Sequence, residues 1–209
     1  MALTYYITAR EQIAPGADAA AQEAALQEHV RAAFRAGMDY VQVREKDLPG
    51  RRLASLADKL AALPEKKLAR LLINERLDIA AACGADGVHL PSNFVPASAV
   101  RRAATKEIIL GVSCHSEEDV REAVRGEATY VLLAPIFATP SKPGTKPLGL
   151  TVLEAVCEWS PIPVLALGGV DATNAAECVL AGAAGVAGIR LFQQARDLNA
   201  LCARLRAMG

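Results

Sequence analysis

Short apolar segments of strand length alternate with helical segments along the whole chain, and this alternation limits the possible folds most strongly. The apolar segments lie at residues 3–8, 40–44, 69–73, 87–90, 108–113, 130–134, 163–167 and 185–189. The helical segments that follow them lie at residues 18–36, 51–63, 76–83, 96–104, 117–125, 151–159, 172–181 and 195–207. Strands separated by helices are expected to pair in parallel, because a crossover helix returns the chain to the starting end of the sheet.

Eight strand–helix units account for all 209 residues, so no part of the chain remains for a second domain. The hydrophobic fraction of 52% is enough for one large core. Eight parallel units close into a barrel, and we predict an α/β fold with one (β/α)8 TIM barrel domain over residues 1–209. A doubly wound open sheet is the alternative fold.

Charge and cysteine content exclude several classes of function. The 23 basic residues balance 23 acidic residues, whereas a domain that binds nucleic acid would show a basic excess. No apolar run is long enough to span a membrane, and the N-terminal MALTYYITAR resembles a strand rather than a cleavable signal. The five cysteines are scattered and form no CxxC motif, so we expect a cytoplasmic protein without disulfides or a zinc site.

Polar residues follow nearly every predicted strand. In a parallel barrel the active site lies at the C-terminal ends of the strands, so these side chains are expected to share one end of the molecule. They are Gln42, Arg44, Lys46, Asn74, Glu75, His89, Ser113, His115, Thr139, Ser141 and Lys142. Packing alone does not require such a distribution, which therefore indicates a binding or catalytic site.

The segment around Arg44 predicts an anion site. Side chains alternate between the two faces of a strand, so Gln42 and Arg44 would face the barrel axis, with Lys46 beyond them. An arginine inside a barrel is unfavourable unless an anion or a carboxylate meets it, and with Lys46 it suits a phosphate or diphosphate. The alternative is an internal ion pair of Arg44 with Glu45 or Glu75.

Three later segments also suit a phosphate. The loop within residues 130–149 combines lysines and hydroxyl groups with prolines and glycines, although many solvated connections have the same composition. Gly168-Gly169 and the GVAGI sequence that contains Gly188 follow the seventh and eighth strands. Their backbone N–H groups would lie where barrels of this type bind phosphate.

His89, Cys114 and His115 have less specific interpretations. A single histidine at a strand end is more often hydrogen-bonded within the structure than a general base. Cys114 would need a neighbour that stabilises its thiolate, so packing is the favoured role. Ser113, Cys114 and His115 cannot form a local triad, because adjacent strand residues point to opposite faces.

The chain carries seven recognisable segments in a fixed order: YVQVREKD, LLINERLDIA, GADGVHLPS, LGVSCHS, YVLLAPIFATPSKPG, VLALGGV and AGAAGVAGI. Together they resemble the thiamine-phosphate synthase family, which also contains the thiazole tautomerases. The resemblance implies an enzyme that joins hydroxymethylpyrimidine diphosphate to thiazole phosphate and releases diphosphate. It also implies a dissociative route in which Mg²⁺ and basic residues stabilise the departing diphosphate.

The resemblance further implies roles for individual residues. The pyrimidine and its diphosphate are expected to contact the strand-two motif, and the thiazole phosphate is expected at the glycine turn. The loop after strand six corresponds to the family's TxTK loop. The implied substrate-binding residues are Gln42, Lys46, Asn74, Thr139, Ser141, Gly168, Gly169, Gly188 and Ile189. The implied catalytic residues are Arg44, Ser113 and Lys142, and the implied metal ligand is Glu75.

The chain departs from the family pattern at its metal site. Glu75 stands where the family has aspartate, and Phe94 stands where a second metal-binding aspartate is usual. Arg190 follows strand eight in place of a phosphate-binding serine, and Pro135 takes the place of the tautomerase histidine. We therefore expect a synthase with a weakened Mg²⁺ site.

Two alternatives remain open from the sequence, a thiazole-phosphate tautomerase and a non-catalytic protein that binds thiamine precursors. The synthase interpretation is favoured because Gln42, Arg44 and Lys46 suit a diphosphate substrate. In all three cases the ligands are phosphorylated small molecules, with no nucleic acid or membrane partner, and a homo-oligomer is compatible with the sequence.

Overall fold

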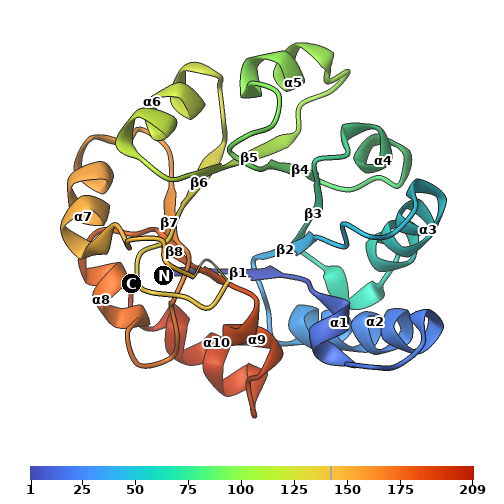
Figure 1. The fold of residues 1–209 in the computed structure, drawn as a ribbon. Helices are drawn as coiled ribbons and strands as arrows, with labels where there is room; N and C mark the ends of the chain where they lie inside the picture. The colour runs from blue at the N-terminus through green and yellow to red at the C-terminus, as the bar shows by residue number, and fades with distance from the viewer. Residues whose placement is uncertain (142) are drawn as a thin grey trace.

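The computed structural model describes residues 1–141 and 143–209, and its eight strands form one closed barrel (Figure 1). The strands are β1 (Leu3–Ile7), β2 (Tyr40–Val43), β3 (Arg70–Asn74), β4 (Gly87–Leu90), β5 (Ile109–Cys114), β6 (Tyr130–Leu133), β7 (Val164–Ala166) and β8 (Gly185–Gly188). Every neighbouring pair is parallel, and β1 closes the barrel on β8, with Leu3 opposite Gly185. The predicted (β/α)8 barrel is confirmed, and the alternative prediction of a doubly wound open sheet is wrong.

A ring of helices surrounds the strands (Figure 1). The helices that follow the strands are α2 (Ala19–Arg35), α3 (Gly50–Ala61), α4 (Leu77–Ala82), α5 (Ala97–Ala103), α6 (Glu117–Arg125), α7 (Gly149–Trp159), α8 (Ala175–Leu180) and α10 (Leu198–Arg206). Three short helices had no counterpart in the sequence prediction: α1 (Arg10–Ile13), the 3₁₀ helix η1 (Pro64–Lys66) and α9 (Arg190–Gln193). Each spans about one turn, which is too short for a recognisable helical period.

Two helices begin three residues later than the sequence predicted, because polar side chains form hydrogen bonds with the backbone just before them. Asp197 accepts a hydrogen bond from Ala200 N at 2.9 Å, so α10 begins at Leu198 rather than at residue 195. Before α8, Asp171 N donates to Asn174 Oδ1 at 2.8 Å, and Asp171 Oδ1 accepts from Thr173 N at 2.7 Å. These bonds hold residues 171–174 in a turn instead of the first turn of a helix.

The strands separate two hydrophobic clusters. Val41 and Val43 belong to the larger cluster between the barrel and its helices, as the alternation in β2 predicted. The smaller cluster fills the barrel and includes Tyr5 and Tyr130. The ring of Tyr130 fits because Gly111 is opposite it on β5, where a Cβ atom would lie 2.0 Å from the ring.

The helices and the cysteines bear on two predictions from the sequence, the absence of a membrane span and the packing role of Cys114. Within the described residues, no helix combines the length and the apolar character needed to cross a bilayer. All five cysteines are free thiols, and Cys114 is fully buried. Burial raises the pKa of the Cys114 thiol to about 12, which supports the packing role over that of a nucleophile.

Candidate active site at the C-terminal ends of the strands

The barrel brings most of the predicted site residues to one end. Gln42 is the third residue of β2, Asn74 ends β3, and Ser113 is the penultimate residue of β5. Gly168 and Gly169 follow β7, Gly188 ends β8, and Ile189 comes next. Arg44, Lys46 and Glu75 follow β2 and β3, while Thr139 and the exposed Ser141 lie in the loop after β6. Lys142 lies outside the described residues.

A continuous set of buried hydrogen bonds crosses the barrel interior. Gln42 Nε2 donates to Asn74 Oδ1 at 2.8 Å, and the hydroxyl of Tyr5 donates to Gln42 Oε1 at 3.1 Å. The hydroxyl oxygens of Tyr5 and Tyr130 are 2.7 Å apart. Two predicted site residues, Gln42 and Asn74, are therefore joined to two tyrosines that were not predicted as site residues.

The same set continues through a histidine. His89 Nδ1 lies 2.9 Å from the Tyr130 hydroxyl, and His89 Nε2 lies 2.8 Å from Ser113 Oγ. We call this set the buried hydrogen-bond chain, and its members are Ser113, His89, Tyr130, Tyr5, Gln42 and Asn74. It takes one residue from each of the strands β1 to β6.

His89 is a neutral member of this chain. Burial, assisted by the positive charge of Arg44, lowers the pKa of its imidazole to about 3. A neutral imidazole has one donor and one acceptor nitrogen, and both contact hydroxyl groups here. This environment favours a hydrogen-bonded structural role for His89 over that of a general base.

Arg44 is a cation that forms no ion pair with any carboxylate among the described residues. Neither of the predicted alternative partners meets it, because Glu45 pairs with Arg10 at 3.0 Å and Glu75 lies 3.8 Å from Lys46 Nζ. Within the described part of the chain Arg44 forms no ion pair, and the internal ion-pair alternative is wrong. An anionic ligand would supply the missing charge.

Arg10 holds the segment after β2 in place. Its guanidinium donates to Glu45 Oε2 at 3.0 Å and to Asp47 Oδ1 at 2.7 Å, and Arg10 is buried. Thr8 Oγ1 donates to Glu45 at 2.6 Å and accepts from the Arg44 backbone N–H at 3.0 Å. Arg10 was not predicted as a site residue, although the alternation that directs Arg44 inward also directs Glu45 to the opposite side, where a buried carboxylate needs a cation.

Glu75 adopts an unusual backbone conformation at the predicted metal site. Its φ is +65°, and a backbone hydrogen bond of 2.8 Å joins Asn74 O to Arg76 N across it. Across residues 1–141 and 143–209, no group of three acidic, histidine or cysteine side chains gathers to hold a metal. Phe94 offers no ligand atom, so Glu75 could bind Mg²⁺ only together with other oxygens, such as those of a substrate diphosphate.

The turn after β7 requires glycine. Gly168 and Gly169 have φ values of +88° and +69°, and a Cβ atom on Gly169 would lie 2.5 Å from Ala138 O. Their carbonyl groups accept hydrogen bonds of 2.9 Å from Phe137 N and Asn174 Nδ2. Their N–H groups have no partner among the described residues, so this turn can donate hydrogen bonds to an anion.

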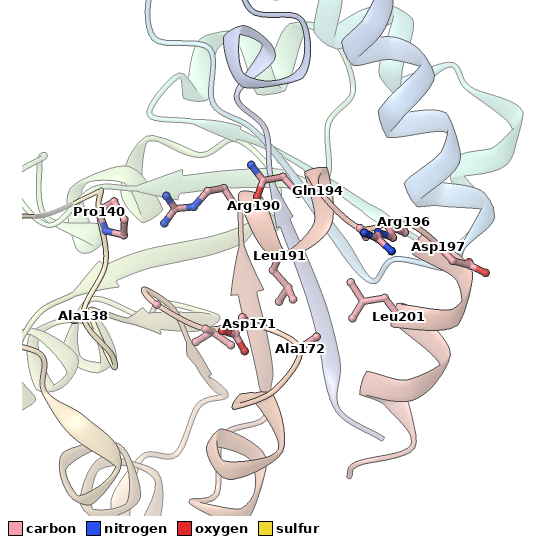
Figure 2. Close-up of a pocket in the computed structure, with 13 residues that line it drawn as sticks. Ala138, Pro140, Asp171, Ala172, Arg190, Leu191, Gln194, Arg196, Asp197 and Leu201 are labelled. Atoms are coloured by element: carbon pink, nitrogen blue, oxygen red, sulfur yellow. The ribbon is translucent and has the colours of Figure 1, made fainter.

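A cleft of about 530 Å³ lies beside this turn, and Gly169, Asp171 and Arg190 contribute to its lining (Figure 2). Figure 2 shows Arg190 extending from the end of β8 toward Pro140 in the loop after β6. Arg190 Nη2 reaches Thr139 Oγ1 at 3.4 Å. Arg190 thus adds an exposed cation at the position where the sequence predicted only the loss of a phosphate-binding serine.

Comparison with known proteins agrees with this architecture. Residues 6–192 match the family described as thiamine monophosphate synthase. A thiamine-phosphate synthase of Roseiflexus castenholzii is 42% identical over 182 residues, which cover 87% of this chain and 80% of that protein. A putative thiamine-phosphate synthase 2 of Aquifex aeolicus is 46% identical over 159 residues, covering 76% of this chain and 85% of that protein.

A solved structure supports the same relationship. The thiamine phosphate pyrophosphorylase from Pyrococcus furiosus superposes with a TM-score of 0.83 at 30% sequence identity, covering 99% of this chain and 94% of that one. The family match spans most of the chain, and the relatives agree with it in both sequence and fold. The chain therefore belongs to the thiamine monophosphate synthase family and is an enzyme of the thiamine-phosphate synthase type.

Proposed function

We propose that this enzyme joins hydroxymethylpyrimidine diphosphate to thiazole phosphate, forming thiamine phosphate and diphosphate. The observation that carries the proposal is the position of Arg44, an uncompensated cation beside the neutral buried hydrogen-bond chain. Neutral donors and acceptors suit a pyrimidine ring, and a cation next to them suits the diphosphate that the ring carries.

In this reaction the bond between the pyrimidinylmethyl carbon and the diphosphate oxygen breaks, and its electron pair leaves with the oxygen. The thiazole nitrogen then donates its lone pair to the cationic carbon, so the positive charge ends on the ring nitrogen of the product. Arg44 and Lys46 stabilise the charge that develops on the diphosphate. Lys142 is proposed to assist them.

The remaining residues bind and orient the two substrates. Asn74 and Ser113 hold the pyrimidine ring, with Gln42 behind Asn74 in the buried chain. The N–H groups of Gly168 and Gly169 hold the thiazole phosphate, with Arg190 as an added cation. Glu75 would hold Mg²⁺ jointly with diphosphate oxygens, and the ion would supply further positive charge for the leaving group.

The test is diphosphate release in the presence of both precursors. We expect release to require both, and we expect Arg44→Gln to lower kcat/KM by at least about 100-fold, the scale of a lost transition-state contact. Arg102→Gln is the matched control, because Arg102 is an exposed arginine on α5 and lies outside the proposed site. Equal activities of the two variants would contradict the proposed role of Arg44.

The same assay separates the alternatives from the sequence analysis. Binding of both precursors without diphosphate release would favour a non-catalytic binding protein. Isomerisation of the exocyclic thiazole carboxylate would favour a tautomerase. The cytoplasmic location, the possible homo-oligomer and the Mg²⁺ requirement stay predictions.

A further inference from the structure

We infer that the buried hydrogen-bond chain runs in one direction, so that it presents Asn74 to the site as a donor and Ser113 as an acceptor. Tyr130, with Tyr5 and His89, is then a positioning residue that sets which ring edge the site accepts. The direction itself follows from contacts within the protein. The identity of the ring rests on the proposed function.

The direction follows from counting protons, starting at Asn74. Gln42 Nε2 donates to Asn74 Oδ1, so Gln42 Oε1 is the acceptor for the Tyr5 hydroxyl. The single proton of Tyr5 is then committed, and the Tyr130 hydroxyl must donate to Tyr5.

The hydrogen bonds from Tyr130 to Ser113 have the same direction. Because the Tyr130 proton is committed to Tyr5, His89 Nδ1 must carry a proton and donate it to Tyr130. A neutral imidazole has no second proton, so His89 Nε2 accepts from the Ser113 hydroxyl. All five hydrogen bonds therefore point the same way, from Ser113 toward Asn74, an arrangement in which each bond strengthens its neighbours.

Burial protects this direction from exchange with water. Tyr5 has a relative exposure of 0%, Gln42 1%, Tyr130 2% and His89 2%. Burial also raises the pKa values of both tyrosine hydroxyl groups and lowers that of His89, so none of the three changes protonation near neutral pH. Reversal would require the Gln42 amide to turn over, the hydroxyl groups to rotate and His89 to change tautomer, all together.

The two ends of the chain face the ligand with opposite character. Asn74 Nδ2 makes no hydrogen bond with any described residue, so its N–H groups can donate to a ligand. The Ser113 hydroxyl has given its proton to His89, so its oxygen can only accept. The matching ligand edge has a ring nitrogen acceptor beside an exocyclic amine donor, which is the edge of an aminopyrimidine.

An oxo group in place of the amine would set an acceptor against the Ser113 oxygen. A site built to hydrogen-bond a ligand group rejects the wrong group strongly, because buried polar atoms are left unpaired. We expect 4-amino-5-hydroxymethyl-2-methylpyrimidine diphosphate to bind at least about 100-fold more tightly than its 4-oxo counterpart.

The direction can be measured without catalysis. In the full-length protein labelled with ¹⁵N-histidine, protonated and unprotonated ring nitrogens give separate NMR signals. The protein contains three histidines, so His29→Gln and His115→Gln identify which signals belong to His89. We expect the His89 proton on Nδ1. A proton on Nε2 would mean the opposite direction, and protons on both nitrogens would mean a charged residue. Either result overturns the inference.

Tyr130→Phe removes the hydroxyl at the centre of the chain. His89 Nδ1 then has no acceptor, so we expect the proton to move to Nε2 and bind Ser113, which frees the serine proton to face the ligand. The preference for the amino over the oxo compound should fall at least about tenfold, as a lost buried hydrogen bond implies. Calorimetric binding of the two compounds measures that preference.

Tyr6→Phe is the matched control. Tyr6 is a fully buried tyrosine of β1, and its hydroxyl donates to Gln193 Oε1 at 3.1 Å, outside the buried hydrogen-bond chain. The Tyr6→Phe variant should keep the His89 proton on Nδ1 and should keep the preference for the amino compound. If Tyr130→Phe keeps them as well, the inference is wrong. If Tyr130→Phe does not fold, the wild-type NMR measurement still decides.

Failure of the proposed function would look different. An enzyme that releases no diphosphate but carries the His89 proton on Nδ1 would refute the reaction and leave the direction of the chain in place. An active enzyme with the His89 proton on Nε2 would support the reaction and refute the direction of the hydrogen-bond chain.

Discussion

Gly169 combines two constraints that only glycine satisfies, a positive φ and a close approach to Ala138 O. Gly169→Ala should therefore lower the free energy of unfolding by about 2 kcal/mol or more, and should weaken thiazole phosphate binding. Gly169→Asp should abolish that binding, because its carboxylate would also repel the phosphate. Urea denaturation and calorimetry measure the two effects.

Gly16→Ala isolates the contribution of the close approach. Gly16 has a φ of +76°, but no atom lies within 4 Å of the position that a Cβ would take, so only the backbone effect of about 1 kcal/mol is expected. Equal losses of stability at the two positions would show that the contact with Ala138 does not matter. Unchanged affinity of Gly169→Asp for thiazole phosphate would place the phosphate elsewhere.

The metal site depends on Glu75 and Phe94. We expect weak Mg²⁺ binding by the free protein and slow diphosphate release, because one carboxylate facing Lys46 is a poor magnesium site. Glu75→Asp with Phe94→Asp should tighten Mg²⁺ binding and raise turnover, and aspartate also tolerates the φ of +65° better than glutamate does.

Glu75→Asp with Phe94→Ala is the control for this pair, since it removes the ring without adding a second carboxylate. The measurement is diphosphate release against Mg²⁺ concentration for all three proteins. Saturation of the wild type at micromolar Mg²⁺ with ordinary turnover would mean that another residue, such as Asn93, supplies the ligand.

At the scale of elements, the short helix α1 supports the segment after β2 through Arg10. Arg10→Ala would leave Glu45 buried without its cation, which should lower the free energy of unfolding by about 3–5 kcal/mol. It should also weaken diphosphate binding, because Glu45 holds the Thr8 hydroxyl that accepts a hydrogen bond from the Arg44 backbone N–H.

Arg125→Ala provides the comparison, since Arg125 pairs with Glu118 on the surface, where the side chains are 62% and 65% exposed. Loss of such a pair should change stability by less than about 1 kcal/mol. Urea denaturation of both variants tests the difference. Similar denaturation midpoints would show that the ion pairs of Arg10 with Glu45 and Asp47 contribute little to the stability of the barrel.

At the scale of the whole molecule, the two ends of the barrel have separate tasks. Asp39, at the N-terminal end, accepts from Thr4 N at 2.9 Å, Thr4 Oγ1 at 2.8 Å and Arg206 Nη2 at 3.0 Å, and so joins β1 to α10. Asp39→Ala should lower the free energy of unfolding by about 2–3 kcal/mol and leave precursor affinities unchanged.

Asp39→Asn keeps an oxygen for Thr4 and should lose less stability than Asp39→Ala. Thermal denaturation and calorimetry of both variants make the comparison. A parallel loss of precursor affinity in the folded Asp39→Ala protein would contradict the separation of the two ends.

The sequence predicted the barrel and the inward position of Gln42, because strand alternation and the number of units depend on local pattern alone. It did not predict that Tyr5 and Tyr130 would join Gln42 to His89. Both tyrosines lie in apolar strands, and their hydroxyl groups meet only after closure of the barrel sets the register. Arg10 and Arg190 were missed as site residues because each opens a four-residue helix without a period.

The buried hydrogen-bond chain uses β1 to β6, whereas the glycine turn follows β7 and Arg190 follows β8. Under the proposed function, the two precursors are therefore recognised by different, contiguous parts of the gene. Exchange of the region that encodes residues 164–197 between homologous barrels would alter the choice of the phosphorylated acceptor and preserve the choice of pyrimidine. A new acceptor specificity could in this way be acquired in one recombination event, with the barrel interior inherited intact.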